Sequence, residues 1–159
     1  MRKRSNRKPR HIRVDNMAYV RTGFVLLSSL EDQYLKIKAE MHSSMNVMVK
    51  GKGTAADIKS LFNVSNMAQS ICHITGLGDD YKDVLDAGHA ALETLGFRAA
   101  RTGSFTMTAG EITAINAMIE IHEAQLTKVT VTELEKACQV INNTPKTLCK
   151  TQTSEHGTP

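Results

Sequence analysis

Residues 108–128 read TAGEITAINAMIEIHEAQLTK and show the longest regular helical period in the chain. Polar side chains recur there every three or four residues, which places them in one narrow stripe along a helix. The stripe consists of Thr113, Asn116, Glu120, Glu123 and Thr127. The other faces are apolar, as is typical of a helix that other helices surround. We therefore expect residues 108–128 to form the central helix of a bundle.

Two helix patterns occupy the first half of the chain. The first follows Ser28 and Ser29, which are candidate N-cap residues, and it stops at Gly51. The second starts at Thr54 in a capping-box pattern and stops at Gly76. Each glycine is expected just past a helix end, where the backbone turns left-handed.

A third helix pattern begins at Asp79 or Asp80, whose carboxylates suit the positive end of a helix dipole. Tyr81 belongs to its expected inner face, and Gly88 on that face predicts the close approach of another helix. We expect this helix to end at Gly96.

The last helix pattern opens with Thr132 and Glu135, which match a capping box. Residues 14–27 are ambiguous, because they fit either a short helix or a strand.

The composition favours a single all-α domain. A chain of 159 residues with 41% hydrophobic residues can close one core, and eight Met without any Trp favour adaptable helix–helix contacts. We expect a bundle of about five helices in residues 14–143. It would lie between a basic arm, residues 1–13, and a flexible tail, residues 144–159.

The basic arm concentrates positive charge at the start of the chain. It holds seven basic residues and no carboxylate, which leaves 13 basic and 16 acidic residues in the rest. Such an arm can bind nucleic-acid phosphates or an acidic partner, or it can be a solubilising tail. Its basic residues are Arg2, Lys3, Arg4, Arg7, Lys8, Arg10 and Arg13.

The cysteines and the hydropathy pattern indicate the setting. Cys72, Cys138 and Cys149 are odd in number and lack metal-ligand spacing, which favours a reduced cytoplasm. The sequence contains no apolar run that approaches 18 residues, so we expect neither a membrane span nor a signal peptide.

The connection before the central helix, RAARTGSFTMT, is the first candidate binding segment. Guanidinium groups and free backbone N–H groups can converge there on a phosphate or a nucleotide. The alternative is a structural turn whose arginines pair with acidic residues. The candidate residues are Arg98, Arg101, Thr102, Gly103 and Ser104.

A second candidate anion site is the turn KGKGT, with Lys50 and Lys52 ahead of a helix N-terminus. This turn lacks the phosphate-loop pattern of nucleotide hydrolases, so it is either a weak anion site or a solvated turn.

Residues that could carry catalysis do not combine into a catalytic set. His122 falls in the apolar row of the central helix and is expected to be a core histidine. Asp86 and His89 form an isolated pair, whereas a di-metal bundle needs paired Glu-x-x-His turns. Cys72 and His73 are adjacent, so their side chains diverge on a helix. We therefore expect no metal, no cofactor and no enzymatic activity.

Four segments together resemble a known family. The basic start MRKRS, the RTGSF connection, TAGEITAINAMIEIHEAQL and VTVTELEKA resemble a family of small helical proteins of bacteriophages and prophages of proteobacteria. The resemblance covers residues 1–143. It implies phage origin and action in the host bacterial cytoplasm, without assigning a role to any residue.

Two functions fit these features. The first is a non-enzymatic, homo-oligomeric interaction protein that binds a host protein or a signalling nucleotide stoichiometrically, as an inhibitor, a sponge or an anti-defence factor. The second is a sequence-independent nucleic-acid-binding accessory or regulator that uses the basic arm.

Overall fold

The computed structural model of the chain describes residues 24–143, so the basic arm and residues 144–159 lie outside the described part. The described residues form an all-α bundle without any β-strand, which confirms the expected fold class. Short 3-10 turns η1 (Leu27–Ser29) and η2 (Asp79–Tyr81) precede two of the helices. The helices are α2 (Glu31–Val49), α3 (Ala55–Thr75), α4 (Lys82–Thr102), α5 (Ala109–Lys128) and α6 (Val131–Asn143).

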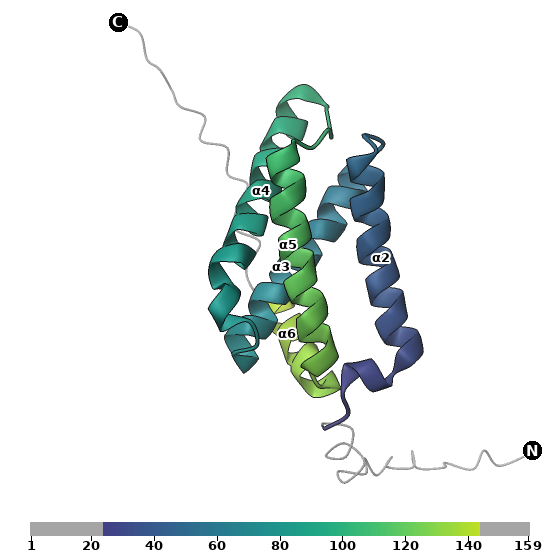
Figure 1. Cartoon of the computed structure of the whole chain (residues 1–159), viewed down its shortest axis with the longest axis vertical. Coiled ribbons are helices and arrows are strands. Elements are labelled where there is room, and N and C mark those ends of the chain that lie inside the picture. Colours follow the sequence, from purple (N-terminus) through teal and green to yellow (C-terminus); the bar gives the residue numbers. More distant parts are fainter. Residues whose placement is uncertain (1–23, 144–159) are drawn as a thin grey trace, which may run out of the picture.

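Two helices, α3 and α5, lie at the centre of the bundle. In Figure 1, α4 and α5 run side by side, and α2 lies across the bundle from α4. The expected central helix, α5, packs against α2, α3 and α4, while α3 packs against all four other helices. The two helices thus hold the bundle together.

Two buried clusters fill the interior. The larger joins α2, α3, α4 and α5 and is rich in methionine, whose unbranched side chains fill irregular gaps between helices. Its members include Met41, Met45, Met48, Leu61, Leu92, Leu95, Met107, Ile115 and Met118. The smaller cluster joins η1, α3 and α6 beneath the end of α5. It contains Leu27, Ile71, Leu126, Val129 and Ala137.

Helix α5 has the faces that its sequence predicts and begins with a capping box. Thr108 Oγ1 accepts a hydrogen bond from the N–H of Glu111, and the Thr108 N–H donates to Glu111 Oε2 at 2.8 Å, which completes a capping box. The predicted polar stripe faces outward. Its member Glu123 is half-buried because Lys38 of α2 lies 3.4 Å from its carboxylate.

Helix α4 continues through Gly96, so the expectation that it ends there is wrong. It runs six residues beyond Gly96, to Thr102, and Gly103, with φ +70°, follows its end. The extension places Arg98 on α4 facing the first turn of α5, where it forms an ion pair. This tertiary contact outweighs the cost of about 1 kcal/mol that glycine adds within a helix.

The prediction that Ser28 or Ser29 caps the first helix is also wrong, because helix α2 begins after Leu30. Ser28 and Ser29 belong to η1. Their hydroxyls donate to the carbonyl oxygens of Thr127, at 3.1 Å, and Leu26, at 2.7 Å, respectively.

Helix α6 begins two residues earlier than predicted. Its capping box uses Thr130 and Glu133, whose Oε2 accepts from the Thr130 N–H at 2.9 Å. Leu26 forms one isolated antiparallel bridge with Thr130 and Leu27 opens η1, so residues 24–26 form neither the expected helix nor the expected strand. Residues 14–23 lie outside the described part.

Candidate functional site

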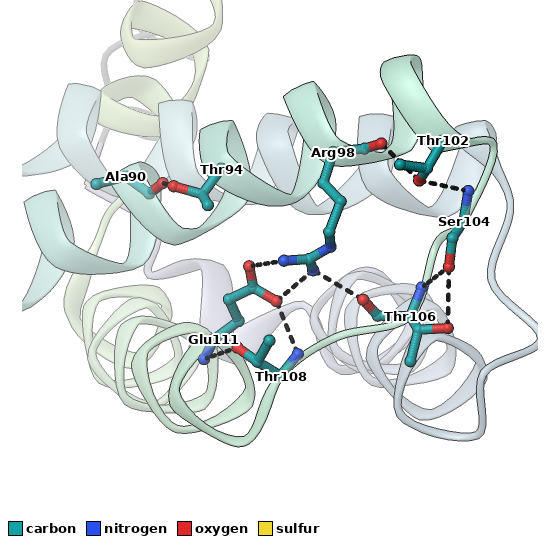
Figure 2. A network of polar contacts seen from close by, with 8 residues as sticks. All are labelled: Ala90, Thr94, Arg98, Thr102, Ser104, Thr106, Thr108 and Glu111. Atoms are coloured by element: carbon teal, nitrogen blue, oxygen red, sulfur yellow. Dashed lines mark hydrogen bonds and ion pairs between the residues drawn. The ribbon is translucent and has the colours of Figure 1, made fainter.

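The predicted anion segment is built around an ion pair between α4 and α5 (Figure 2). Arg98 donates from Nη1 to Glu111 Oε1 at 2.8 Å and from Nη2 to Glu111 Oε2 at 2.6 Å. Its Nη2 also donates to the Thr106 carbonyl oxygen at 2.7 Å. This is the fork geometry in which guanidinium binds carboxylate best. Arg98 is therefore engaged within the protein, as the structural alternative predicts.

The ion pair shifts the acidity of its carboxylate. Hydrogen bonds from Arg98 hold the pKa of Glu111 below its usual range, although burial of the carboxylate opposes them. The N–H of Thr108 at the helix start acts in the same direction as Arg98. Glu111 is buried, so its charge is matched by a partner, as buried charges must be.

Of the remaining candidate residues in the connection, some stabilise the turn and Arg101 faces the solvent. Thr102 Oγ1 donates to the Arg98 carbonyl oxygen at 2.8 Å and accepts from the Ser104 N–H at 3.2 Å, which fixes the turn around Gly103. Arg101 is exposed and makes no side-chain ion pair or hydrogen bond with residues 24–143. Of the two predicted arginines, Arg101 alone is available to a ligand.

The turn that follows α2, whose residues include Lys50 and Lys52, lies at the same end of the bundle as the α4–α5 connection (Figure 1). Both are exposed, and Gly51 between them has φ +67°, which confirms its place after the end of α2. Neither lysine has an ion-pair partner within the described residues. Together with Arg101, the two lysines give this end of the described bundle three cations that form no ion pair with a carboxylate of residues 24–143.

A different hollow lies between the η2 turn and α5, and its volume is about 270 Å³. Its apolar wall comes from Leu77, Ile121 and Ala124, and charged groups lie on its rim. Tyr81 borders it with 56% of its surface exposed, so the expectation that Tyr81 belongs to the inner face is wrong. The charged rim residues are Glu120 and Lys128. The volume suits one large side chain or a small planar ligand.

A buried amide supports the wall of this hollow. Gln125 donates from Nε2 to the carbonyl oxygens of Ala68, at 3.1 Å, and Leu77, at 2.7 Å. Because the amide nitrogen serves both carbonyls, Oε1 faces His122, whose Nδ1 lies 3.2 Å away and carries the proton. The two residues fix the α3–η2 turn against α5, and Gly78 in this turn packs against Gln125.

His122 is the core histidine that the helix pattern predicts. It is 2% exposed, and burial lowers the pKa of its imidazole to about 4. The ring is therefore neutral at neutral pH.

A second hollow, of about 400 Å³, contains a thiol that is poorly suited to nucleophilic attack. Cys72 donates a hydrogen bond to Asp79 Oδ1 at 3.1 Å. Burial raises the pKa of the Cys72 thiol to about 11, and the carboxylate of Asp79 acts in the same direction. His73 is exposed, and its side chain diverges from that of Cys72, as the side chains of adjacent helix residues do.

Ser65, His89 and Glu93 resemble a hydrolytic triad in composition alone. Ser65 Oγ lies 2.9 Å from His89 Nδ1, and His89 Nε2 lies 3.7 Å from Glu93 Oε1. Ser65 is fully buried within α3, so a substrate carbonyl cannot reach its hydroxyl. The trio ties α3 to α4.

The described residues form a helical bundle with a side-chain-sized hollow beside Tyr81 and a cationic end. Among the described residues, no three potential ligand side chains gather to hold a metal, and no helix has the length and hydropathy to cross a membrane. No protein-family model, curated protein or solved structure matches the chain. The arm cations, from Arg2 to Arg13, lie outside the described residues.

Sequence reasoning missed the hollow beside Tyr81. Its wall combines residues of η2 with residues of α5 that lie about 40 positions later in the chain. Periodicity reports which face of one helix is apolar, but it does not report where two elements leave a gap. The one available signal was the sequence LGDDY at residues 77–81, in which a turn at Gly78 precedes the aromatic residue.

Proposed function

We propose that the protein is a non-enzymatic interaction protein that binds another protein stoichiometrically through the hollow beside Tyr81. The observation that carries this proposal is an exposed tyrosine over an apolar wall, with Glu120 and Lys128 on the rim. Tyrosine and apolar pockets anchor protein interfaces, and charged rims select the partner. The buried Gln125 fixes the wall before binding, which lowers the entropy lost on association.

The proposed partner is a host protein, and the setting is a bacterial cell infected by a phage, as the sequence resemblance implies. Binding of this kind inhibits or sequesters the host protein, for example one that defends the cell against the phage. A signalling nucleotide is less well supported as the ligand. Glu111 engages Arg98, so Arg101 is the one arginine of the α4–α5 connection left for a phosphate, and Lys50 and Lys52 at the same end belong to a separate turn. Phosphate recognition usually combines several donors at one site.

The test compares a hollow-filling variant with a matched control. Ala124→Arg places a long side chain in the hollow, and Ala39→Arg makes the same change on the exposed face of α2. Each protein is immobilised and exposed to host lysate, and bound proteins are quantified by mass spectrometry.

We expect the wild type and Ala39→Arg to retain one host protein in equimolar amount and Ala124→Arg to lose it. Retention that is equal in all three proteins would exclude the hollow as the binding site. Calorimetric titration with nucleotides separates the other ligand class. Nucleotide binding that Arg101→Ala abolishes and Ala124→Arg preserves would instead assign function to the α4–α5 connection.

A second function, sequence-independent nucleic-acid binding, is favoured by the seven cations of residues 1–13. If all seven meet duplex phosphates, the slope of log affinity against log salt approaches about −6. Fluorescence polarisation with duplex DNA and RNA compares the full chain with a variant that begins at Val14. Binding that the shorter variant retains would exclude the arm.

A further inference from the structure

The outer face of α4 carries a continuous stripe of exposed residues. Six positions spaced four, three, four, three and four residues apart lie within about 80° of one another around a helix that advances 100° per residue. The stripe faces away from Leu85, Leu92 and Leu95, which are buried in the core. Its members, Asp83, Ala87, Ala90, Thr94, Phe97 and Arg101, are all exposed. We call this surface the α4 stripe.

The α4 stripe lacks a partner within the described chain. Helix α4 lies at the side of the bundle (Figure 1), and Phe97 exposes 75% of its surface there. Asp83 and Arg101, at the two ends, make no side-chain hydrogen bond or ion pair with residues 24–143. Thr94 Oγ1 donates to the Ala90 carbonyl oxygen at 2.9 Å, so this hydroxyl needs no outside partner.

The residues of the α4 stripe are arranged symmetrically about position 92. Asp83 and Arg101 lie equally far from that position, as do Ala87 and Phe97. The members of each pair are complementary: Asp83 is acidic and Arg101 is basic, while Ala87 is small and Phe97 is large. Ala90 and Thr94 form the innermost pair and are both small. A surface with this order is complementary to itself when one copy is reversed.

We propose that the α4 stripe binds a second copy of this chain, with the two α4 helices antiparallel and the two-fold axis near position 92. In this arrangement Asp83 of one copy faces Arg101 of the other, and the contact occurs twice. Phe97 packs against the second copy's Ala87, where the short side chain leaves room for the ring. The spacing of the stripe is that of a helix pair with a heptad seam.

Two further features fit a second copy. A surface hollow of about 550 Å³ is lined by Thr94, Phe97, Arg98 and Arg101, so the face is recessed beside the phenyl ring. The charge order along α4 is acidic at its start and basic at its end, which only an antiparallel partner matches. The hollow beside Tyr81 belongs to η2 and α5, so this inference stands apart from the proposed function.

The carboxylate of Glu93 opposes the proposed dimer. Glu93 lies beside the stripe next to position 92, so the two copies of Glu93 come close across the axis. His89 Nε2 lies 3.7 Å from Glu93 Oε1 and is the neighbour of this carboxylate on α4. Asp86, on the same flank, is already paired with Lys82 at 3.1 Å.

The test uses a charge exchange on the full-length protein, with the dimer dissociation constant measured by sedimentation equilibrium under reducing conditions. We expect Asp83→Arg and Arg101→Asp each to raise the dissociation constant about tenfold or more, because each places two like-charge contacts in the dimer. The double variant restores opposite charges and should return the constant to within about threefold of wild type. Asp32→Arg repeats the reversal in the first turn of α2 and should have no effect.

The apolar contact has its own variant. Phe97→Ala should weaken the dimer several-fold, whereas Leu35→Ala, at a residue 52% exposed on α2, should leave it unchanged. Circular dichroism of each variant verifies that the fold is retained. A wild-type protein that stays monomeric up to its solubility limit overturns the proposal. A dimer that Phe97→Ala leaves intact, or that the charge exchange fails to restore, also overturns it.

Discussion

Gly88 of α4 lies directly against Met118 of α5. A Cβ atom on Gly88 would stand 2.5 Å from the Met118 Cβ and 2.9 Å from its Sδ. The absence of a side chain is therefore what allows the two helices to approach, as the sequence predicts for this position. Both residues are buried in the region where α4 and α5 form their long contact.

The first prediction compares the two glycines of α4. Gly88→Ala should lower the free energy of unfolding by about 1–3 kcal/mol, because the core has no room for the methyl group. Gly96→Ala should raise it by about 1 kcal/mol, since alanine favours the helix and its Cβ would meet Phe62 at an ordinary 3.7 Å. Urea denaturation measures both. A destabilising Gly96→Ala would contradict the continuous helix.

The second prediction concerns the Arg98–Glu111 ion pair. Arg98→Met keeps much of the length of the side chain and removes its hydrogen bonds, so the free energy of unfolding at neutral pH should fall by about 1–3 kcal/mol. Lys82→Met removes the exposed ion pair with Asp86 and should have little effect. Urea denaturation of the two variants measures the contrast, and equal losses would contradict a special role for the buried carboxylate.

The same pair predicts a pH dependence. The pKa of Glu111 is lowered in the folded protein from an ordinary value of 4.5. The stabilisation is therefore complete above about pH 4.5 and is lost as the pH falls through the lower folded value. The difference between wild type and Arg98→Met, measured by urea denaturation, should shrink in acid. A difference that is constant down to about pH 3 would assign the effect to packing.

The positions of the helices could be predicted from the sequence, and their ends only in part. Apolar periodicity located α5 and its polar stripe, and Gly88 indicated a close helix. The end of α4 could not be predicted, because an ion pair made by Arg98 with a later helix outweighs the local preference of Gly96. Thr130 and Thr132 each precede a glutamate by three residues, and local sequence cannot choose between them.

The candidate sites were less predictable than the fold. The arginine segment was located, but whether Arg98 is free or paired depends on where Glu111 lies in space. The hollow beside Tyr81 arises from the meeting of a turn with a distant helix, and no local pattern reports such a gap. The α4 stripe is visible in the sequence as a spacing, yet its exposure follows only from knowing which face of α4 packs on α5.

The third prediction concerns His122, whose pKa is lowered from 6.5 to about 4 by burial. Between about pH 6.5 and pH 4 the unfolded chain binds a proton at this histidine and the folded protein does not. Stability is therefore complete above about pH 6.5 and decreases as the pH falls towards 4, by up to about 3 kcal/mol. His122→Asn should remove this dependence over the same pH range. Urea denaturation at several pH values measures it, and parallel curves for the two proteins would contradict the assignment.

The last prediction concerns the reactivity of the cysteines. Cys72 is 6% exposed, and its thiol has a pKa of about 11, so roughly one molecule in a thousand carries the thiolate at about pH 8. Cys138 is half-buried. Iodoacetamide should therefore modify Cys138 well before Cys72 in the folded protein, as peptide mass spectrometry can follow. Asp79→Asn removes the carboxylate that accepts from the thiol and should speed modification of Cys72. If Cys72 reacts as fast as Cys138 in the wild type, α3 and η2 open often enough to expose it, and the raised pKa does not control its chemistry.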